Sequence, residues 1–85
     1  MADQWVVYVL RSLKTGRLYT GSTNDLERRL GEHDRGKTPY TRYAGPFELV
    51  YHEDQPSGPT ARRRERFLKS GQGREEVKRL LRSAG

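Results

Sequence analysis

The chain has only 85 residues and contains no cysteine, so neither disulfides nor thiolate-bound metals can support its fold. Its composition therefore excludes a disulfide scaffold, a zinc site built on thiolates and a thiol nucleophile. A chain of this length buries only about 60–65% of its unfolded surface, so its hydrophobic core must be thin. We expect one small domain spanning residues 1–85, whose fold depends on how its few apolar residues are spaced.

Membrane insertion and secretion are not expected. No apolar run approaches the roughly 18–20 residues that span a bilayer. Residues 1–4 have neither the basic start nor the apolar stretch of a secretory leader. The sequence therefore predicts a soluble, cytoplasmic domain.

The apolar spacing predicts three strands and three helices. Residues 5–11, 18–21 and 47–53 are rich in β-branched and aromatic side chains, and the continuous apolar run in the first of them predicts a central strand. Helices are predicted from an N-cap at Asn24 to residues 35–36, from 60 to 70 and from 74 to 82, with Gly71 and Gly73 separating the last two. Residues 36–46 are predicted to form a loop. The expected fold class is α/β (α+β), a small sandwich with a three-stranded, mostly antiparallel sheet flanked by helices in the order β-β-α-β-α-α.

The net charge of +6 is concentrated in one quarter of the chain. Residues 62–82 contain nine Lys or Arg and three acidic residues, whereas the rest of the chain is neutral. A one-sided basic patch favours a polyanion as partner, with nucleic acid first and an anionic membrane second. A merely solubilising face remains the alternative explanation.

Three polar side chains fall where a purely structural helix would place aliphatic ones. His33 continues the inward spacing of Leu26 and Leu30, and Arg29 lies beside it. Glu65 shares the apolar face of its own predicted helix. Each could be a satisfied core or edge residue, but a thin core cannot hold several desolvated charges unless they meet one another, a metal or a phosphate.

Two tyrosines complete the candidate site. Tyr8 and Tyr19 alternate with apolar neighbours on the first two predicted strands, and a short hairpin can place both rings on one face. Tyrosine is also simply a good strand residue.

These residues belong to a series of short motifs in a fixed order. The motifs are Val7-Tyr8, Tyr19-Thr20-Gly21, residues 26–29 with His33, residues 46–51 and residues 61–65. Together they resemble the GIY-YIG nuclease superfamily, and most of all its small stand-alone single-domain members of the UPF0213 type. Two positions depart from the family pattern, because Val6 replaces a glycine of the first tripeptide and Thr20 replaces an isoleucine of the second.

The resemblance implies a role for each matching residue. The implied catalytic set is Tyr8, Tyr19, Arg29, His33 and Glu65, with Glu65 as the metal ligand and Gly21 as a structural glycine. It implies one Mg²⁺ or Mn²⁺ ion, with Tyr19 as first candidate for the base, Tyr8 positioning the water and His33 as the alternative base. The asparagine that some members carry after the metal glutamate has no match here, so the outer metal shell is undefined.

The resemblance implies a metal-dependent endonuclease with little sequence specificity, acting on nucleic acid, with DNA favoured over RNA. The basic residues expected to contact the substrate are Arg42, Arg62, Arg63, Arg64 and Arg66. No membrane partner and no small-molecule cofactor are expected, and the oligomeric state is open. The alternatives are a non-catalytic nucleic-acid-binding module on the same scaffold and a basic partner-binding domain that binds no nucleic acid.

Overall fold

The order of the elements agrees with the sequence prediction. The computed structural model describes residues 4–36 and 43–84. Its elements are β1 (Trp5–Ser12), β2 (Leu18–Thr23), α1 (Leu26–Asp34), β3 (Phe47–Gln55), α2 (Gly58–Lys69) and α3 (Gly71–Ala84). The predicted order β-β-α-β-α-α is therefore confirmed. Across these two ranges no helix is both long and apolar enough to cross a membrane.

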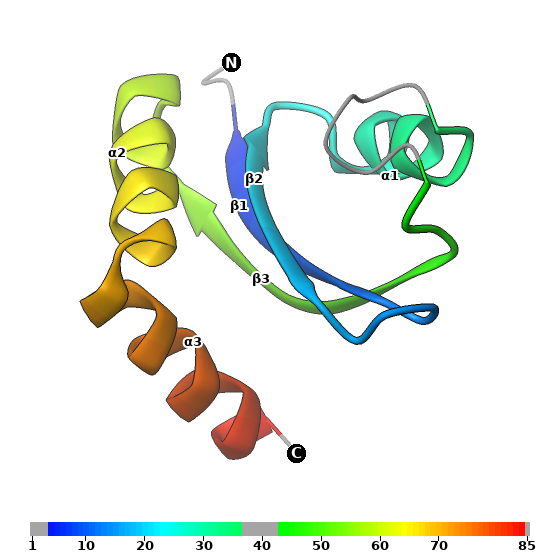
Figure 1. Ribbon diagram of the computed structural model, residues 1–85. Helices are drawn as coiled ribbons and strands as arrows, with labels where there is room; N and C mark the ends of the chain where they lie inside the picture. Colours follow the sequence, from blue (N-terminus) through cyan, green and yellow to red (C-terminus); the bar gives the residue numbers. More distant parts are fainter. Residues whose placement is uncertain (1–3, 37–42, 85) are drawn as a thin grey trace.

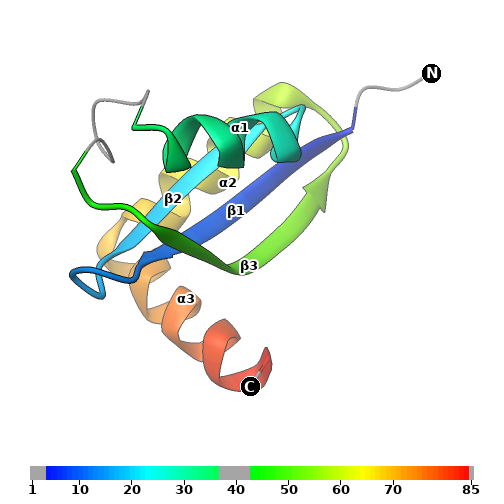
Figure 2. The ribbon, with the colours of Figure 1, turned by 90° about the vertical axis from the view of Figure 1, so that its right-hand side faces the viewer.

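The three strands form one antiparallel sheet with β1 in the middle. The strand order is β2-β1-β3, and β1 pairs antiparallel with both neighbours. Helix α1 lies over one face of the sheet, whereas α2 and α3 lie on the other (Figures 1 and 2). Residues 7–10 in the middle of β1 are buried because layers cover both faces. This confirms the predicted sandwich and its central strand.

Alternation along β1 separates the hydrophobic core from the candidate site. Val7 and Val9 pack with Ala61, Leu68 and Val77 in the layer between the sheet and helices α2 and α3. Because successive side chains of a strand point to opposite faces, Tyr8 and Leu10 point toward the α1 side. Thus β1 contributes to the core with one face and to the site with the other.

Helix α1 begins one residue later than predicted, and the N-cap at Asn24 is wrong. Strand β2 continues to Thr23, whose hydroxyl accepts a hydrogen bond from the backbone N–H of Asp25. The Asp25 side chain then caps the helix by accepting from the backbone N–H of Arg28. Residue 24 is used as the link between strand and helix.

The predicted break between α2 and α3 is shorter than expected, because residues 71–73 belong to α3. Gly73 is buried, and a side chain there would collide with the backbone of Phe67 and Leu68. This glycine therefore permits the close approach of two helix ends. The Ser70 hydroxyl accepts a hydrogen bond from the Gly73 N–H at the start of α3.

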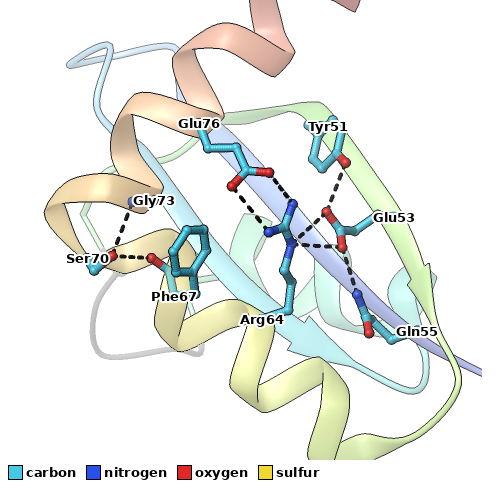
Figure 3. Close-up of polar contacts among 8 residues, drawn as sticks. All are labelled: Tyr51, Glu53, Gln55, Arg64, Phe67, Ser70, Gly73 and Glu76. Atoms are coloured by element: carbon cyan, nitrogen blue, oxygen red, sulfur yellow. Dashed lines mark hydrogen bonds and ion pairs between the residues drawn. The ribbon is translucent and has the colours of Figure 1, made fainter.

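A network centred on one arginine ties α2 and α3 to the sheet. Arg64 of α2 lies 3.1 Å from a carboxylate oxygen of Glu53 on β3 and 2.8 Å from one of Glu76 on α3 (Figure 3). Tyr51 and Gln55 donate further hydrogen bonds to Glu53. The hydrogen bonds to Glu76 and Glu53, with the negative charges of these carboxylates, raise the pKa of Arg64 above its ordinary value, and desolvation offsets part of that rise.

Candidate active site

A buried tyrosine–histidine pair lies between β1 and α1. The hydroxyl of Tyr8 is 2.9 Å from Nε2 of His33, and both side chains are buried. Their rings meet edge to face with centroids 5.8 Å apart. His33 thus points inward, as its helical spacing predicted, and meets a phenol from the sheet.

Gly21 leaves the space that the Tyr8 ring occupies. The two residues are paired across β1 and β2. A Cβ added to Gly21 would lie 2.5 Å from Cζ of Tyr8, far inside normal contact distance. The structural role that the resemblance assigned to this glycine therefore has a direct physical cause, because only a residue without a side chain lets the phenol lie across β2.

Arg29 stands beside this pair, one helical turn before His33. Its guanidinium forms an ion pair of 3.1 Å with Glu32. It is also close enough to Tyr8 that its hydrogen bond and its charge act on the phenol. Tyr8 from β1 therefore meets Arg29 and His33 from α1 at one place.

This environment keeps the pair in its uncharged form at neutral pH. Burial raises the pKa of the Tyr8 phenol above its ordinary value, and Arg29 offsets part of that rise. Burial, followed by the positive charge of Arg29, lowers the pKa of His33 below its ordinary value of about 6.5. A neutral His33 with its hydrogen on Nδ1 accepts a hydrogen bond from the Tyr8 hydroxyl at Nε2.

Tyr19 shares the face of the sheet that carries Tyr8. It is paired with Leu10, two residues after Tyr8 on β1, so the predicted placement of both tyrosines on one face is confirmed. Its ring packs edge to face on Phe47 with centroids 5.7 Å apart, and Phe47 packs in the same way on His33 at 6.0 Å. Phe47 therefore connects the two tyrosines with the imidazole in one aromatic cluster.

Glu65 reaches the site from the opposite layer. It lies on α2, where one carboxylate oxygen accepts a hydrogen bond from the Ser22 hydroxyl and the other is 2.7 Å from Nζ of Lys69. Ser22 follows Gly21 directly on β2, the edge strand over which the Tyr8 phenol lies. The Glu65 carboxylate is close enough that its charge raises the pKa of Tyr8. The phenol and the carboxylate thus approach the same edge of the sheet from opposite faces.

The donor set fits a divalent ion whose remaining ligands come from the substrate phosphate and from water. In the described ranges, no three Asp, Glu or His side chains are grouped so that they could enclose a metal. Glu65 and Glu32 are both half-buried, and both act by charge on the Tyr8 phenol. Glu32 is paired with Arg29, whereas the orientation of Glu65 is fixed by the hydroxyl of Ser22. Mg²⁺ is commonly held by one or two carboxylates together with phosphate oxygens and water, and a single fixed carboxylate suits that arrangement.

The arginines expected to contact nucleic acid are in three different situations. Arg62, Arg63 and Arg66 are exposed on α2. Arg64 is held by the carboxylates of the network described above, so its charge is already balanced (Figure 3). Arg42 lies outside the described residues.

Sequence reasoning missed three residues that contact the site. Lys69 lies four residues after Glu65, a spacing that places their side chains together on a helix and could have indicated the pair. Ser22 and Phe47 gave no such signal, because their contacts depend on how the layers of the sandwich are placed.

Comparisons with known proteins identify the family. The family profile described as the GIY-YIG catalytic domain matches residues 4–78. A UPF0213 protein of Natronomonas pharaonis is 46% identical over 71 residues, which cover 82% of each chain. A UPF0213 protein of Oceanobacillus iheyensis is 52% identical over 52 residues, which cover 60% of this chain and 59% of that relative.

A solved structure shows a similar fold. The solution NMR structure of a UPF0213 protein from Bacillus halodurans is 40% identical, with a TM-score of 0.55 over 91% of this chain and 84% of the other. The profile match, the similar sequences and this structure lead to one conclusion. The chain belongs to the GIY-YIG domain family, which is a family of nucleases.

Proposed function

We propose that this protein is a metal-dependent endonuclease that hydrolyses phosphodiester bonds of nucleic acid, with DNA favoured and with little sequence specificity. The observation that carries the proposal is the meeting of Tyr8, His33 and Arg29 with Glu65 at the edge of the sheet. Phosphodiester hydrolysis requires activation of water, stabilisation of the phosphate charge and a ligand for the metal, and these side chains could supply all three. Nothing in a purely structural helix would require Arg29 and His33 on its inner side.

Glu65 would hold one Mg²⁺ or Mn²⁺ ion through its carboxylate. Such an ion supplies Lewis-acid polarisation of the phosphate and aligns the reacting groups. Ser22 fixes the carboxylate by hydrogen bonding to one oxygen. Lys69 pairs with the other oxygen, so its ammonium balances the charge of Glu65 until a cation or a substrate binds.

The Tyr8–His33 pair is the best placed group to activate water. Tyr8 takes the proton of the attacking water as its own hydroxyl proton passes to Nε2 of His33, which is neutral and within hydrogen-bonding distance. The water oxygen forms the new bond to phosphorus as the bond to the leaving sugar oxygen breaks. This assignment moves the base role from Tyr19 to Tyr8 and leaves Tyr19 to position the substrate beside Phe47.

Arg29 would stabilise the charge that develops on the non-bridging phosphate oxygens. Its guanidinium offers planar, paired N–H donors, a geometry that matches phosphate. Removing one such preorganised donor typically lowers kcat about 10²–10³-fold. Arg29 also lies beside the Tyr8 phenol and favours its ionised form as the proton leaves.

The proposal is tested by incubating end-labelled branched, nicked, single-stranded and duplex DNA, and single-stranded RNA, with the protein and either Mg²⁺ or Mn²⁺. We expect cleavage of at least one substrate, lost in EDTA and in Glu65→Gln, and reduced about 10²–10³-fold in Arg29→Ala. Arg28→Ala is the matched control, because Arg28 is an exposed neighbour on the same helix that pairs only weakly with Asp25.

Two results would contradict the proposal. One is that every substrate stays intact while circular dichroism shows folded protein. The other is that Glu65→Gln cleaves as fast as the unchanged chain. Retention of an electrophoretic shift without cleavage would instead support a binding module on the same scaffold.

A further inference from the structure

The exposed positive charges of α2 are spread over about 120° of the helix surface. At about 100° per residue, Lys69 and Arg62 lie about 40° and 60° from Glu65, and Arg66 lies about 100° from it. Arg63 lies about 160° from Glu65 and about 60° beyond Arg66, toward β3. All four cations are exposed. We call Arg62, Arg66 and Lys69, spaced i, i+4 and i+7, the basic stripe.

The side of α2 that faces β3 offers less free positive charge. Arg63 lines a surface hollow there, together with Gln55, Thr60, Arg64 and Phe67. The charge of Arg64 is balanced by its two carboxylate partners (Figure 3). A polyanion that follows α2 is therefore attracted more strongly to the basic stripe than to this hollow.

Each end of the basic stripe is held in place by contact with a neighbouring side chain. At one end, Nζ of Lys69 is 2.7 Å from the Glu65 carboxylate, which places that end at the candidate site. At the other end, the Arg62 guanidinium lies over the Trp5 ring, 5.6 Å from its centroid. Stacking on an aromatic ring holds a guanidinium in place while its edge N–H groups remain able to donate to phosphate.

We propose that the nucleic-acid strand next to the scissile phosphate follows the basic stripe along α2, from Lys69 at the site to Arg62 on Trp5. This inference rests on the proposed function. Residues 62 and 69 are separated by about 10.5 Å along the helix axis, which corresponds to about three nucleotides of a stacked strand. Contacts of this kind grip phosphates and do not read bases, so the flanking strand is bound without sequence preference.

The test measures binding without turnover. A fluorescein-labelled 12-nucleotide single strand is titrated by anisotropy in EDTA at several NaCl concentrations. In EDTA Lys69 stays paired with Glu65, so the two free cations of the stripe, Arg62 and Arg66, should make log K fall against log[NaCl] with a slope of about −1.4. Each of Arg62→Gln and Arg66→Gln should make the slope shallower by about 0.7. Arg63→Gln removes the same charge from the same helix and should leave the slope unchanged.

A second readout comes from Trp5, the single tryptophan of the chain. Oligonucleotide binding should change Trp5 emission in the unchanged chain and in Arg63→Gln, and should change it less in Arg62→Gln. The inference is overturned if Arg63→Gln and Arg62→Gln reduce the slope equally, or if the strand fails to bind at low salt. Failure of the proposed function is distinct, because a chain that binds along the stripe but never cleaves would refute catalysis and leave the inference standing.

Discussion

Replacing Gly21 by alanine tests the most specific steric feature of the site. The added Cβ would lie 2.5 Å from Cζ of Tyr8, whereas carbon atoms in contact are normally about 3.5–4.0 Å apart. The ring must therefore retreat by at least about 1 Å. Tyr8 is almost fully buried, and its hydroxyl is 2.9 Å from His33, so a retreat of this size breaks the hydrogen bond that holds the pair.

This displacement should lower both the folding stability and the rate of cleavage. Overpacking a well-filled site typically costs about 1–3 kcal/mol of folding free energy. A misplacement of about 1 Å at a reacting group lowers the rate by about 10²-fold. We therefore expect Gly21→Ala to remain folded, to unfold at lower urea concentration and to cleave about 10²-fold more slowly.

The assay combines urea denaturation with the metal-dependent cleavage measurement. Gly71→Ala is the control, because a Cβ at Gly71 meets no atom within 4 Å. A double-mutant cycle with Tyr8→Ala isolates the steric cause, since the stability cost of Gly21→Ala should largely disappear when the phenol is absent. Full activity in Gly21→Ala, or the same stability cost in both backgrounds, would refute the reasoning.

Three further predictions follow from the network, the buried imidazole and the edge strand. Arg64→Met should lower the free energy of unfolding by about 1.5–3 kcal/mol in urea titrations, because the half-buried carboxylates that pair with Arg64 lose their cation. The control Arg63→Met should change the free energy of unfolding by less than about 0.5 kcal/mol. Equal losses in the two variants would contradict the structural role of Arg64. Because the pKa of His33 is lowered in the folded state, the unfolded chain binds more protons as the pH falls below about 6.5, so stability should drop between pH 7.5 and 5.5, and His33→Asn should drop less. An equal drop in both proteins would show that His33 is not the group responsible. Ser22→Ala should raise the Mg²⁺ concentration for half-maximal cleavage about 10-fold, and Ser22→Thr, which keeps a hydroxyl, should raise it less; no change in Ser22→Ala would remove its positioning role.

The fold was largely predictable because its signals are local. The apolar run of β1 indicated a central strand, and apolar spacing indicated the helix that became α2. The two local errors have local causes. Propensity cannot locate a strand end to one residue, so the sequence places the cap one residue early, at residue 24. A glycine after a helix predicts a stop, whereas Gly73 serves helix–helix contact.

The site was predictable only in part, because half of it depends on the contact between layers. Helical spacing indicated that His33 faces inward, and strand alternation indicated that Tyr8 and Tyr19 share a face. Spacing gave no information on which strand residue would meet Glu65 from the other face. For the same reason, the run of arginines on α2 looked uniform in sequence, although Arg64 is an internal ion-pair residue.

The central claim is that groups from both faces of the sheet form one metal-assisted site at the edge of β2. The most direct test is the line broadening that Mn²⁺ causes in ¹⁵N-labelled protein bound to a short oligonucleotide with a terminal phosphate. We expect sub-stoichiometric Mn²⁺ to broaden first the amide signals of Gly21, Ser22 and Glu65, and to leave residues 78–83 of α3 sharp. Broadening centred on α3, with sharp signals around Glu65, would contradict the account.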